Sequence, residues 1–355
     1  MTVPTTDSKM YQTMQGQPAE LRRLLAEGWE PAAEAATLLA NAERVILTGI
    51  GTSYHAALVG SWLLRAAGVD ARAVLSFDLA HYPESYPLNA RDAVIVMAHT
   101  GVKRFSGEAL ARANAAGATV LSLGSRTAEH PGSRLVLRTT DRETSAAYTA
   151  SHLLAMTALA QVAVALGEGR AAPGVTGFRT ALDGLPDQVA GVLAREAEIE
   201  PVARGAVERR SYVAGVGPNE ATALELVIKA REAAHAHIDA LAAEQFLHGP
   251  MVAVNAGDQA ILVNVPGAGT ERIGEIAAVL AAMGADLWLV GQGVEVVPDA
   301  TVFALPELPE ILSPLLAVIP MQLCAYGMAA ARGINPDTFR RDDPRYAAAF
   351  GLLKL

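Results

Sequence analysis

The sequence predicts an α/β protein built from two similar α/β/α sandwiches, each with a parallel, doubly wound sheet. Short apolar runs rich in β-branched residues alternate with helix-like stretches, which is the pattern of a parallel sheet covered by helices on both faces. The same order of elements occurs twice. When the two halves are laid over one another, Gly49 and Gly51 fall on Gly215 and Gly217. A duplicated unit therefore explains the chain of 355 residues better than one large sheet.

The first half begins with residues 1–16, for which we expect a loose arm. Residues 18–42 have a helical pattern in which Pro31 marks a break or the first turn of a second helix. Helix-like segments separate the first four of the strands that follow. The strands expected in this half are 44–49, 71–76, 92–98, 118–124 and 134–139.

A helical stretch at 146–166, a Gly/Pro/Ala loop at 167–175 and another helical segment to about residue 199 connect the halves. The strands expected in the second half are 211–217, 237–243, 258–265, 285–291 and 300–306. The uncharged run 311–331 contains Pro314 and Pro320, which favours a buried, proline-interrupted helix over a membrane span. The expected organisation is an N-terminal arm with helices (1–42), a first domain (43–190), a second domain (195–325) and a C-terminal tail over the active site (326–355).

Composition excludes several classes of function. The net charge is −9 and no basic cluster is present, which argues against nucleic acid and anionic membranes as partners. The single cysteine, Cys324, rules out a disulfide framework and a thiolate metal cluster, and it suggests a reducing compartment. Residues 1–20 contain no apolar signal core. We therefore expect a soluble cytoplasmic protein.

The stretch 49–60 joins the first strand to a helix through the sequence Gly-Ile-Gly-Thr-Ser. Such a turn presents backbone N–H groups and two hydroxyls at a helix N-terminus, where an anion can bind. The alternative is an ordinary turn in which Thr52 or Ser53 caps the helix. The second copy, 215–219, keeps the glycines and loses the hydroxyls, so phosphate binding is expected at Gly51, Thr52 and Ser53 of the first copy alone.

A second polar loop, 98–110, follows the third strand of the first half. Because parallel strands deliver their loops to one edge of the sheet, Thr100, Gly101 and Lys103 should come near the first loop. A solvated loop with an incidental Lys-Arg pair is the alternative. A third segment, 143–151, could cap the same pocket.

The second half offers acid–base groups. Lys229 and Glu232 lie three residues apart in a helical stretch and so share a face, and His248 follows in a Gly-Pro turn. Taken alone, the first two fit a surface ion pair, and the histidine fits a turn residue bonded to backbone. A carboxylate and a histidine beside a sugar phosphate are also the pair needed to move a proton between carbons next to a carbonyl.

Three motifs resemble the sugar isomerase (SIS) domain family as found in glucosamine-fructose-6-phosphate synthases. GIGTSYHAALVG (49–60) is similar to its G-T-S-Y-H-A signature, and ALELVIKAREAAHAHIDALAAEQFLHGPM (223–251) to its block from A-L-E to H-G-P. LSPLLAVIPMQLCAYGMAAARGINPD (312–337) is similar to its C-terminal L-S-P stretch. The likeness covers roughly residues 10–340 and implies tandem SIS-type sandwiches with flavodoxin-like sheets.

Carried over by position, the resemblance implies roles for individual residues. The family's S-Q-S-G-E-T phosphate loop falls on 98–103, where Lys103 would replace a hydroxyl with a full charge. The histidine of the H-G-P turn opens the sugar ring from a neighbouring subunit, which implies a homodimer with the active site at its interface. The expected catalytic residues are Glu232, which transfers the proton, His248 and Lys229. The expected substrate- or phosphate-binding residues are Gly51, Thr52, Ser53, His99, Thr100, Gly101, Lys103, Ala147 and Thr149.

Two departures from the family pattern limit what is expected. The chain opens at Met1 without a nearby cysteine, so we expect no glutaminase and no use of glutamine as the ammonia source. The family's C-terminal active-site lysine falls on Pro344, and Lys354 is too displaced to replace it. The complete synthase reaction is therefore not expected.

The function expected is that of a phosphosugar deaminase and isomerase with a small sugar phosphate as its partner. On glucosamine 6-phosphate it would give fructose 6-phosphate and ammonia. Alternatives are a fructosamine 6-phosphate deglycase, which would give glucose 6-phosphate and an amine, and a simple aldose–ketose isomerase. A sensor that binds sugar phosphates without turnover is the alternative from another class. No metal and no organic cofactor is expected, because no ligand cluster or dinucleotide motif stands out.

Overall fold

The computed structural model describes residues 7–292, 297 and 299–352. Their contacts divide them into two compact units. The N-terminal unit consists of residues 16–143 and 150–186, and the C-terminal unit of residues 7–15, 144–149 and 187–352. Each unit contains one five-stranded sheet in which every pairing is parallel.

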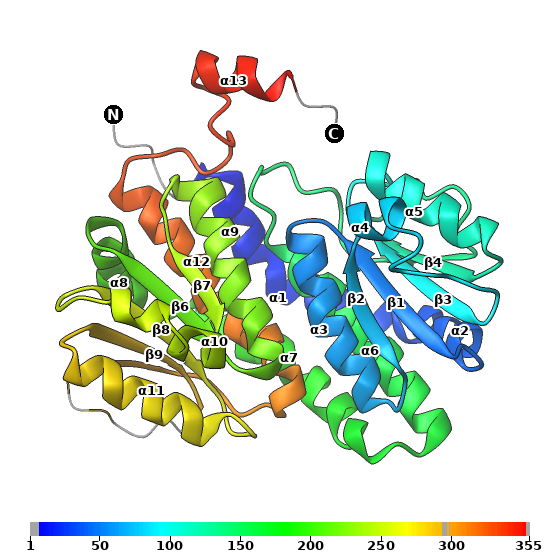
Figure 1. Cartoon of the computed structure of the whole chain (residues 1–355), viewed down its shortest axis with the longest axis horizontal. Helices are drawn as coiled ribbons and strands as arrows, with labels where there is room; N and C mark the ends of the chain where they lie inside the picture. Colours follow the sequence, from blue (N-terminus) through cyan, green and yellow to red (C-terminus); the bar gives the residue numbers. More distant parts are fainter. Residues whose placement is uncertain (1–6, 293–296, 298, 353–355) are drawn as a thin grey trace. The chain divides into compact units, whose positions relative to one another are not determined.

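The sheet of the N-terminal unit has the strand order β2-β1-β3-β4-β5 (Figure 1). Its strands are β1 (Arg44–Gly49), β2 (Ala71–Leu75), β3 (Asp92–Met97), β4 (Thr119–Gly124) and β5 (Leu135–Arg138). The helices of this unit are α2 (Trp29–Leu39), α3 (Thr52–Ala66), α4 (Ser76–His81), α5 (Arg104–Ala115) and α6 (Ala150–Arg170), with a 3-10 turn at η2 (Pro173–Val175). Helix α7 (Phe178–Leu193) begins in this unit and ends in the other.

The sheet of the C-terminal unit has the order β7-β6-β8-β9-β10, which matches the first sheet strand for strand. Its strands are β6 (Ser211–Gly215), β7 (Asp239–Ala242), β8 (Gln259–Asn264), β9 (Asp286–Gly291) and β10 (Thr301–Ala304). The helices are α8 (Glu196–Glu208), α9 (Glu220–Ala234), α10 (Ala243–Leu247), α11 (Thr270–Ala282), α12 (Pro314–Ala331) and α13 (Pro344–Phe350), with 3-10 turns at η3 (Gly217–Asn219), η4 (Pro250–Ala253) and η5 (Glu310–Leu312).

The two parallel five-stranded sheets predicted from the sequence are confirmed, and all ten strands lie where they were expected. Both sheets have the flavodoxin-type order, with the strand order reversing between the first and third strands of each unit. A short helix follows the second strand in each copy, α4 in one and α10 in the other. The glycine two residues past the first strand has a positive φ in both, 59° at Gly51 and 57° at Gly217.

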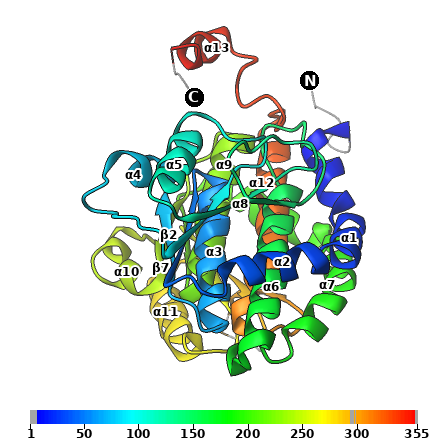
Figure 2. The same cartoon turned by 90° about the vertical axis from the view of Figure 1, so that its right-hand side faces the viewer.

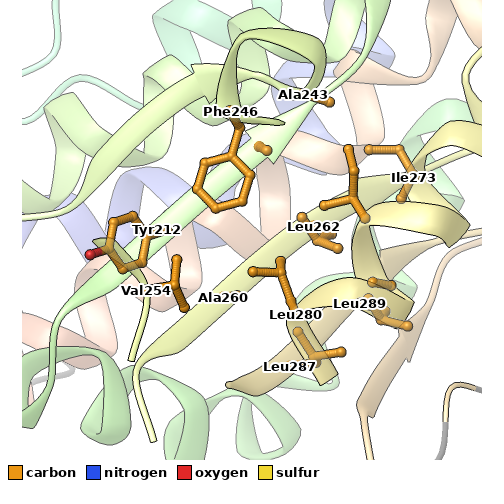
Figure 3. Packing of buried hydrophobic residues seen from close by; sticks show 13 residues of the cluster. Tyr212, Ala243, Phe246, Val254, Ala260, Leu262, Ile273, Leu280, Leu287 and Leu289 are labelled. Atoms are coloured by element: carbon orange, nitrogen blue, oxygen red, sulfur yellow. The ribbon is translucent and has the colours of Figure 1, made fainter. Parts of the chain in front are cut away.

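The same layers cover both sheets. In the N-terminal unit α4 and α5 pack on one face, while α3 and α2 pack on the other with α6 outside them (Figure 2). In the C-terminal unit α10 and α11 cover the corresponding face and α9 and α12 the opposite one. Figure 3 shows the core under α10 and α11, in which Tyr212 and Phe246 lie beside aliphatic side chains of β8, β9 and α11. Burial of these apolar faces stabilises each sandwich.

Two helices are long and apolar enough to cross a membrane by length and composition, Ala150–Arg170 and Glu310–Ala331. Their most apolar windows are 94% and 89% buried by protein. Helix α6 packs against α2 and α3, and α12 packs against α8 and α9. This burial identifies them as core helices of their units.

Local details differ from the sequence-based expectations. Residues 9–16 are not a loose arm, because α1 (Lys9–Glu27) begins at Lys9, where the Asp337 carboxylate accepts the backbone N–H of Lys9 at 2.7 Å and of Met10 at 2.9 Å. Helix α6 begins at residue 150 rather than 146 and continues to 170 through part of the expected loop. Helix α12 runs unbroken through Pro320 and continues to residue 331, past the expected domain end at 325.

Candidate active site

The turn between β1 and α3 leaves a helix N-terminus without a side-chain cap. Gly51, not Thr52 or Ser53, is the N-cap residue, so the capped-turn alternative is wrong. The Gly51 carbonyl accepts the backbone N–H groups of Tyr54 at 2.8 Å and His55 at 3.1 Å. The N–H groups of the first helical turn point out of the helix end, and the hydroxyls of Thr52 and Ser53 are half-buried beside them. Such an arrangement suits an anion.

Gly49 is required by the close approach of the strand end to α3. A Cβ at this position would lie 2.6 Å from the carbonyl carbon of Ser53 and 2.7 Å from its oxygen. The second copy repeats the constraint, since a Cβ on Gly215 would lie 2.2 Å from the carbonyl oxygen of Asn219. The glycines therefore belong to the fold, as the comparison of the two copies in the sequence indicated.

The loop after β3 lies at the same edge of the sheet, because β1 and β3 are parallel neighbours in the sheet. Thr100 is half-buried, and Gly101 has a φ of 93° that favours glycine. Lys103 is the N-cap residue of α5, and its backbone N–H donates to the Ser106 hydroxyl at 2.8 Å. Its side chain is exposed to solvent.

His99 holds a neighbouring segment in place. Its ring Nε2 accepts the backbone N–H of Glu143 at 3.1 Å, and the Glu143 carboxylate accepts the backbone N–H of Ser151 at 2.6 Å. Burial lowers the pKa of His99 to about 4, and the charge of Arg142 adds to this effect. The ring is therefore neutral near pH 7 and contributes no positive charge to an anion.

Ala147 and Thr149 belong to the C-terminal unit and have fully buried side chains. The backbone N–H of Ala147 donates to the Ser145 hydroxyl at 3.2 Å, and the carbonyl of Thr149 accepts from the side chain of Gln322 at 3.2 Å. The structure thus shows both residues inside the core rather than on a surface.

On α9 three charged residues form one buried cluster. The Lys229 ammonium lies 2.6 Å from the Glu232 carboxylate and 3.5 Å from that of Glu225. The side chain of Lys229 is 1% exposed, that of Glu232 18% and that of Glu225 0%. The alternative of a surface ion pair, considered from the sequence, is therefore excluded. Glu225 was missed by the sequence analysis. Its spacing of four residues before the lysine is the signal that places it on the same helix face.

His248 is at the C-terminal end of α10 with its ring 69% exposed. The ring Nε2 lies 3.0 Å from the Glu244 carboxylate rather than bonding to backbone. The same carboxylate accepts two hydrogen bonds from Arg272, and this pairing, followed by the bond to His248, lowers the pKa of Glu244 to about 2. Within the described chain, His248 makes no hydrogen bond or ion pair with Glu232.

A cavity of about 520 Å³ opens beside the Glu232 carboxylate. The last turn of α9 forms one wall, and the segment after α12, including α13, forms another. Two polar residues of these walls, His235 and Arg340, were not expected from the sequence. Pro344, which falls on the position of the family's lysine, begins α13 and is exposed.

In the part of the chain that the structure describes, other residues close the corresponding turn of the second copy. In η3, Pro218 has no N–H to offer, and the side chain of Asn219 is buried, donating to the Ser313 hydroxyl at 2.8 Å. The carboxylate of Glu310 fills the space over Gly267, where a Cβ would lie 2.1 Å from its carboxyl carbon. In the second copy, other residues of the chain thus fill the space beside this turn.

Comparison with known proteins shows which families this chain is similar to. The SIS domain model matches residues 38–165, which run from the end of α2 into α6. Residues 38–165 of this chain are therefore similar to the SIS domain family. The chain is 30% identical over 314 residues to glutamine–fructose-6-phosphate aminotransferase (isomerizing) of Gloeobacter violaceus, covering 84% of this chain and 51% of that protein. The Pyrococcus horikoshii enzyme of the same name is 28% identical over 330 residues, covering 90% and 54%.

Solved structures of the SIS fold superpose over nearly the whole chain. The C-terminal domain of glucosamine-fructose-6-phosphate aminotransferase from Francisella tularensis gives a TM-score of 0.85 at 16% identity, covering 93% of this chain and 98% of that one. Glucosamine-6-phosphate deaminase from Thermotoga maritima gives 0.70 at 19% identity, covering 93% and 97%. At these identities the likeness shows the fold alone. The chain spans about half the length of the curated relatives it matches.

Among the described residues, no group of three or more His, Cys, Asp or Glu side chains could hold a metal ion. Cys324 is fully buried in α12, and burial raises the pKa of its thiol to about 12. It therefore supplies no thiolate for chemistry near neutral pH.

Proposed function

We propose that this SIS protein releases the nitrogen of an amino-sugar 6-phosphate by an isomerisation that moves a proton between carbons 1 and 2. The observation that carries the proposal is the Glu232 carboxylate, which is fixed by the buried ammonium of Lys229 at 2.6 Å and lines a cavity of about 520 Å³. A carboxylate held in one place beside a ligand-sized space is suited to general acid–base catalysis.

With glucosamine 6-phosphate as substrate, Glu232 removes the proton from carbon 2 of the open-chain aldehyde and returns it to carbon 1. The product of this transfer is the carbon 2 imine. Water adds to the imine, the carbon–nitrogen bond of the carbinolamine breaks, and ammonia leaves fructose 6-phosphate behind. The sequence needs no oxidant or reductant.

In this proposal the phosphate is bound by the first turn of α3, the hydroxyls of Thr52, Ser53 and Thr100, and the charge of Lys103. The uncapped N-terminus of α3 and the exposed lysine support the assignment.

His248 is proposed to open the sugar ring, and to do so in the active site of a second copy of the chain. The exposure of its ring, 69%, supports a role outside its own unit. A homodimer in the cytoplasm is therefore part of this proposal.

The test is replacement of Glu232 by glutamine, which preserves size and removes the base. We expect ammonia release from glucosamine 6-phosphate to fall by at least a thousandfold while sugar-phosphate binding, measured by calorimetry, changes less than threefold. The matched control is Glu271→Gln on the exposed face of α11, which should keep full activity. Full activity in Glu232→Gln would show that another group moves the proton.

A simple aldose–ketose isomerisation is the second candidate. Tagatose-6-phosphate ketose/aldose isomerase from Escherichia coli has the same fold, with a TM-score of 0.74 at 18% identity. Assaying isomerised sugar phosphate and released amine together separates the two reactions, because the isomerase releases no amine. Binding of sugar phosphates without any turnover would instead indicate a sensor.

A further inference from the structure

Another cavity of the C-terminal unit, with a volume of about 770 Å³, lies between α8, α12 and the start of α1. It shares no lining residue with the cavity beside Glu232. Helices α8 and α12 approach each other closely at Gly327, where a Cβ would lie 2.8 Å from the Cβ of Ala203. Gly327, Ala330 and Ala331 line the cavity from α12 with little side-chain volume. The resulting space is in the range of pockets that hold small organic ligands.

Two tyrosine rings line this cavity. Tyr11 comes from α1 and Tyr326 from α12, and their ring centres lie 5.1 Å apart with the planes at 35° to each other. Burial raises the pKa of Tyr11, and its hydrogen bond to Glu196 adds to this effect. The Tyr11 phenol is therefore protonated near pH 7. The faces of tyrosine rings attract cations.

Glu196, the first residue of α8, places a carboxylate beside these rings. It accepts a hydrogen bond from the Tyr11 hydroxyl at 3.0 Å. Within the part of the chain that the structure describes, this half-buried carboxylate forms no ion pair. Glu200, a second carboxylate of the lining, lies 2.9 Å from the Arg204 guanidinium and is paired with it. The described lining thus carries one negative charge without a cationic partner, next to aromatic rings.

We propose that this cavity binds an organic ammonium ion with an apolar body. The ammonium pairs with Glu196 and contacts the Tyr11 ring, and the apolar body lies on Leu193 and Leu323, which also line the cavity. A carboxylate that is partly removed from water gains most from a directly paired, hydrogen-bonded cation. A neutral ligand would leave Glu196 without that cation, and an anion would find Arg204 already in an ion pair.

A simple amine fits this lining better than a free amino acid does. Glu196 and Arg204 are eight residues apart on α8, which separates their Cα atoms by about 12 Å. The ammonium and carboxylate of an α-amino acid are joined to one carbon, so they do not bridge these two side chains. With its ammonium on Glu196, the carboxylate of an amino acid would lie near a like charge and be repelled.

Calorimetry on the unaltered protein compares phenethylammonium with 2-phenylethanol, which has a hydroxyl in place of the ammonium, and with phenylalanine, which adds a carboxylate. We expect phenethylammonium to bind at least tenfold more tightly than either of the others. Because the experiment measures binding and not turnover, its outcome is independent of the proposed function. Equal binding of phenethylammonium and 2-phenylethanol, or no binding of the cation at millimolar concentration, would overturn the inference.

Substitutions then test where the cation binds. Glu196→Gln should weaken phenethylammonium binding at least tenfold and leave any binding of 2-phenylethanol within twofold, whereas Tyr11→Leu should weaken both. Glu208→Gln, at the exposed far end of α8, is the matched control and should bind as the unaltered protein does. Circular dichroism checks that each variant is folded. Unchanged cation binding in Glu196→Gln would reject the assignment.

Discussion

At the scale of single residues, the most consequential feature is a buried lysine. Lys229 is 1% exposed and lies between the carboxylates of Glu225 and Glu232 on one face of α9. Removing a charge from water costs several kcal/mol, which only close pairing offsets. The pairing with Lys229 therefore holds the Glu232 carboxylate in place.

Replacing Lys229 by methionine tests this cluster. The variant keeps the apolar length of the side chain and leaves two carboxylates without their cation, so we expect a loss of about 3–5 kcal/mol in the free energy of unfolding. Urea denaturation measures it. Lys103→Met is the control, since that side chain is exposed and should change stability by less than about 0.5 kcal/mol. Equal effects of the two substitutions would contradict the cluster's role.

His130 gives the N-terminal unit a predictable response to acid. Its ring is 6% exposed, neither ring nitrogen has a partner among the described residues, and burial, with a contribution from Arg138, lowers its pKa to about 4. In the unfolded chain the His130 ring therefore binds a proton near pH 6.5, whereas in the folded state it binds one only near pH 4. The stability associated with the neutral ring is complete above pH 6.5 and is lost as the pH falls towards 4.

We expect unfolding free energy to decrease by at most about 1.4 kcal/mol per pH unit from this histidine between those limits. Denaturation of His130→Leu at a series of pH values should show a shallower slope than the unaltered protein. Because His99 titrates in the same direction, part of the slope should remain. An unchanged slope would show that His130 is protonated in the folded state.

At the scale of elements, the turn between β1 and α3 is required by the fold and also forms part of the proposed phosphate site. Gly49 lets the strand end approach the first turn of α3, and Gly51 caps that turn without a side chain. The N-terminus of α3 therefore carries no side-chain cap. The same strand–turn–helix in the second copy is closed by Pro218, Asn219 and the carboxylate of Glu310.

Gly49→Ala should displace α3, because the new methyl group would lie 2.6 Å from the carbonyl carbon of Ser53. We expect binding of fructose 6-phosphate to weaken at least tenfold and stability to fall by about 1–3 kcal/mol. In Gly107→Ala nothing lies within 4 Å of the added Cβ inside α5, so this control should stabilise the protein by about 0.5–1 kcal/mol. Unchanged binding in Gly49→Ala would remove the turn from the phosphate site.

At the scale of the whole molecule, the two sandwiches have the same architecture but carry different proposed functional groups. Both keep the strand order and the covering helices, but the proposed anion cradle is in the N-terminal unit and the buried acid–base cluster in the C-terminal unit. This divergence predicts one phosphate site per chain.

Calorimetric titration with fructose 6-phosphate should therefore give a stoichiometry of one. The double variant Thr52→Val with Ser53→Ala should weaken this binding at least tenfold, since two hydroxyl donors are lost at the helix end. Thr37→Val, on the exposed face of α2, is the control and should bind as before. Two sites per chain, or unaltered binding in the double variant, would contradict the assignment.

The sequence by itself determined the ten strands, their parallel arrangement, the repeated order of the elements and the positions of the motifs that resemble the SIS domain. These features follow from local hydrophobic periodicity and from glycine spacing, both of which can be read directly from the sequence. The glycine turn, for example, was assigned to the fold because Gly215 repeats Gly49, and the close approach of the helix backbone in both copies confirms it.

Only the tertiary structure decided which side chains are buried, which are open and which share a space. In the structure Gly51 is the N-cap residue of α3, and the side chains of Ala147, Thr149 and Lys229 are buried. Helix α1 begins at Lys9, whose backbone N–H donates to the Asp337 carboxylate. It also brought Arg340 and His235, about a hundred residues apart in sequence, to one cavity. Burial and cavities arise from contacts between segments that are distant in the sequence, so the local pattern of residues does not predict them.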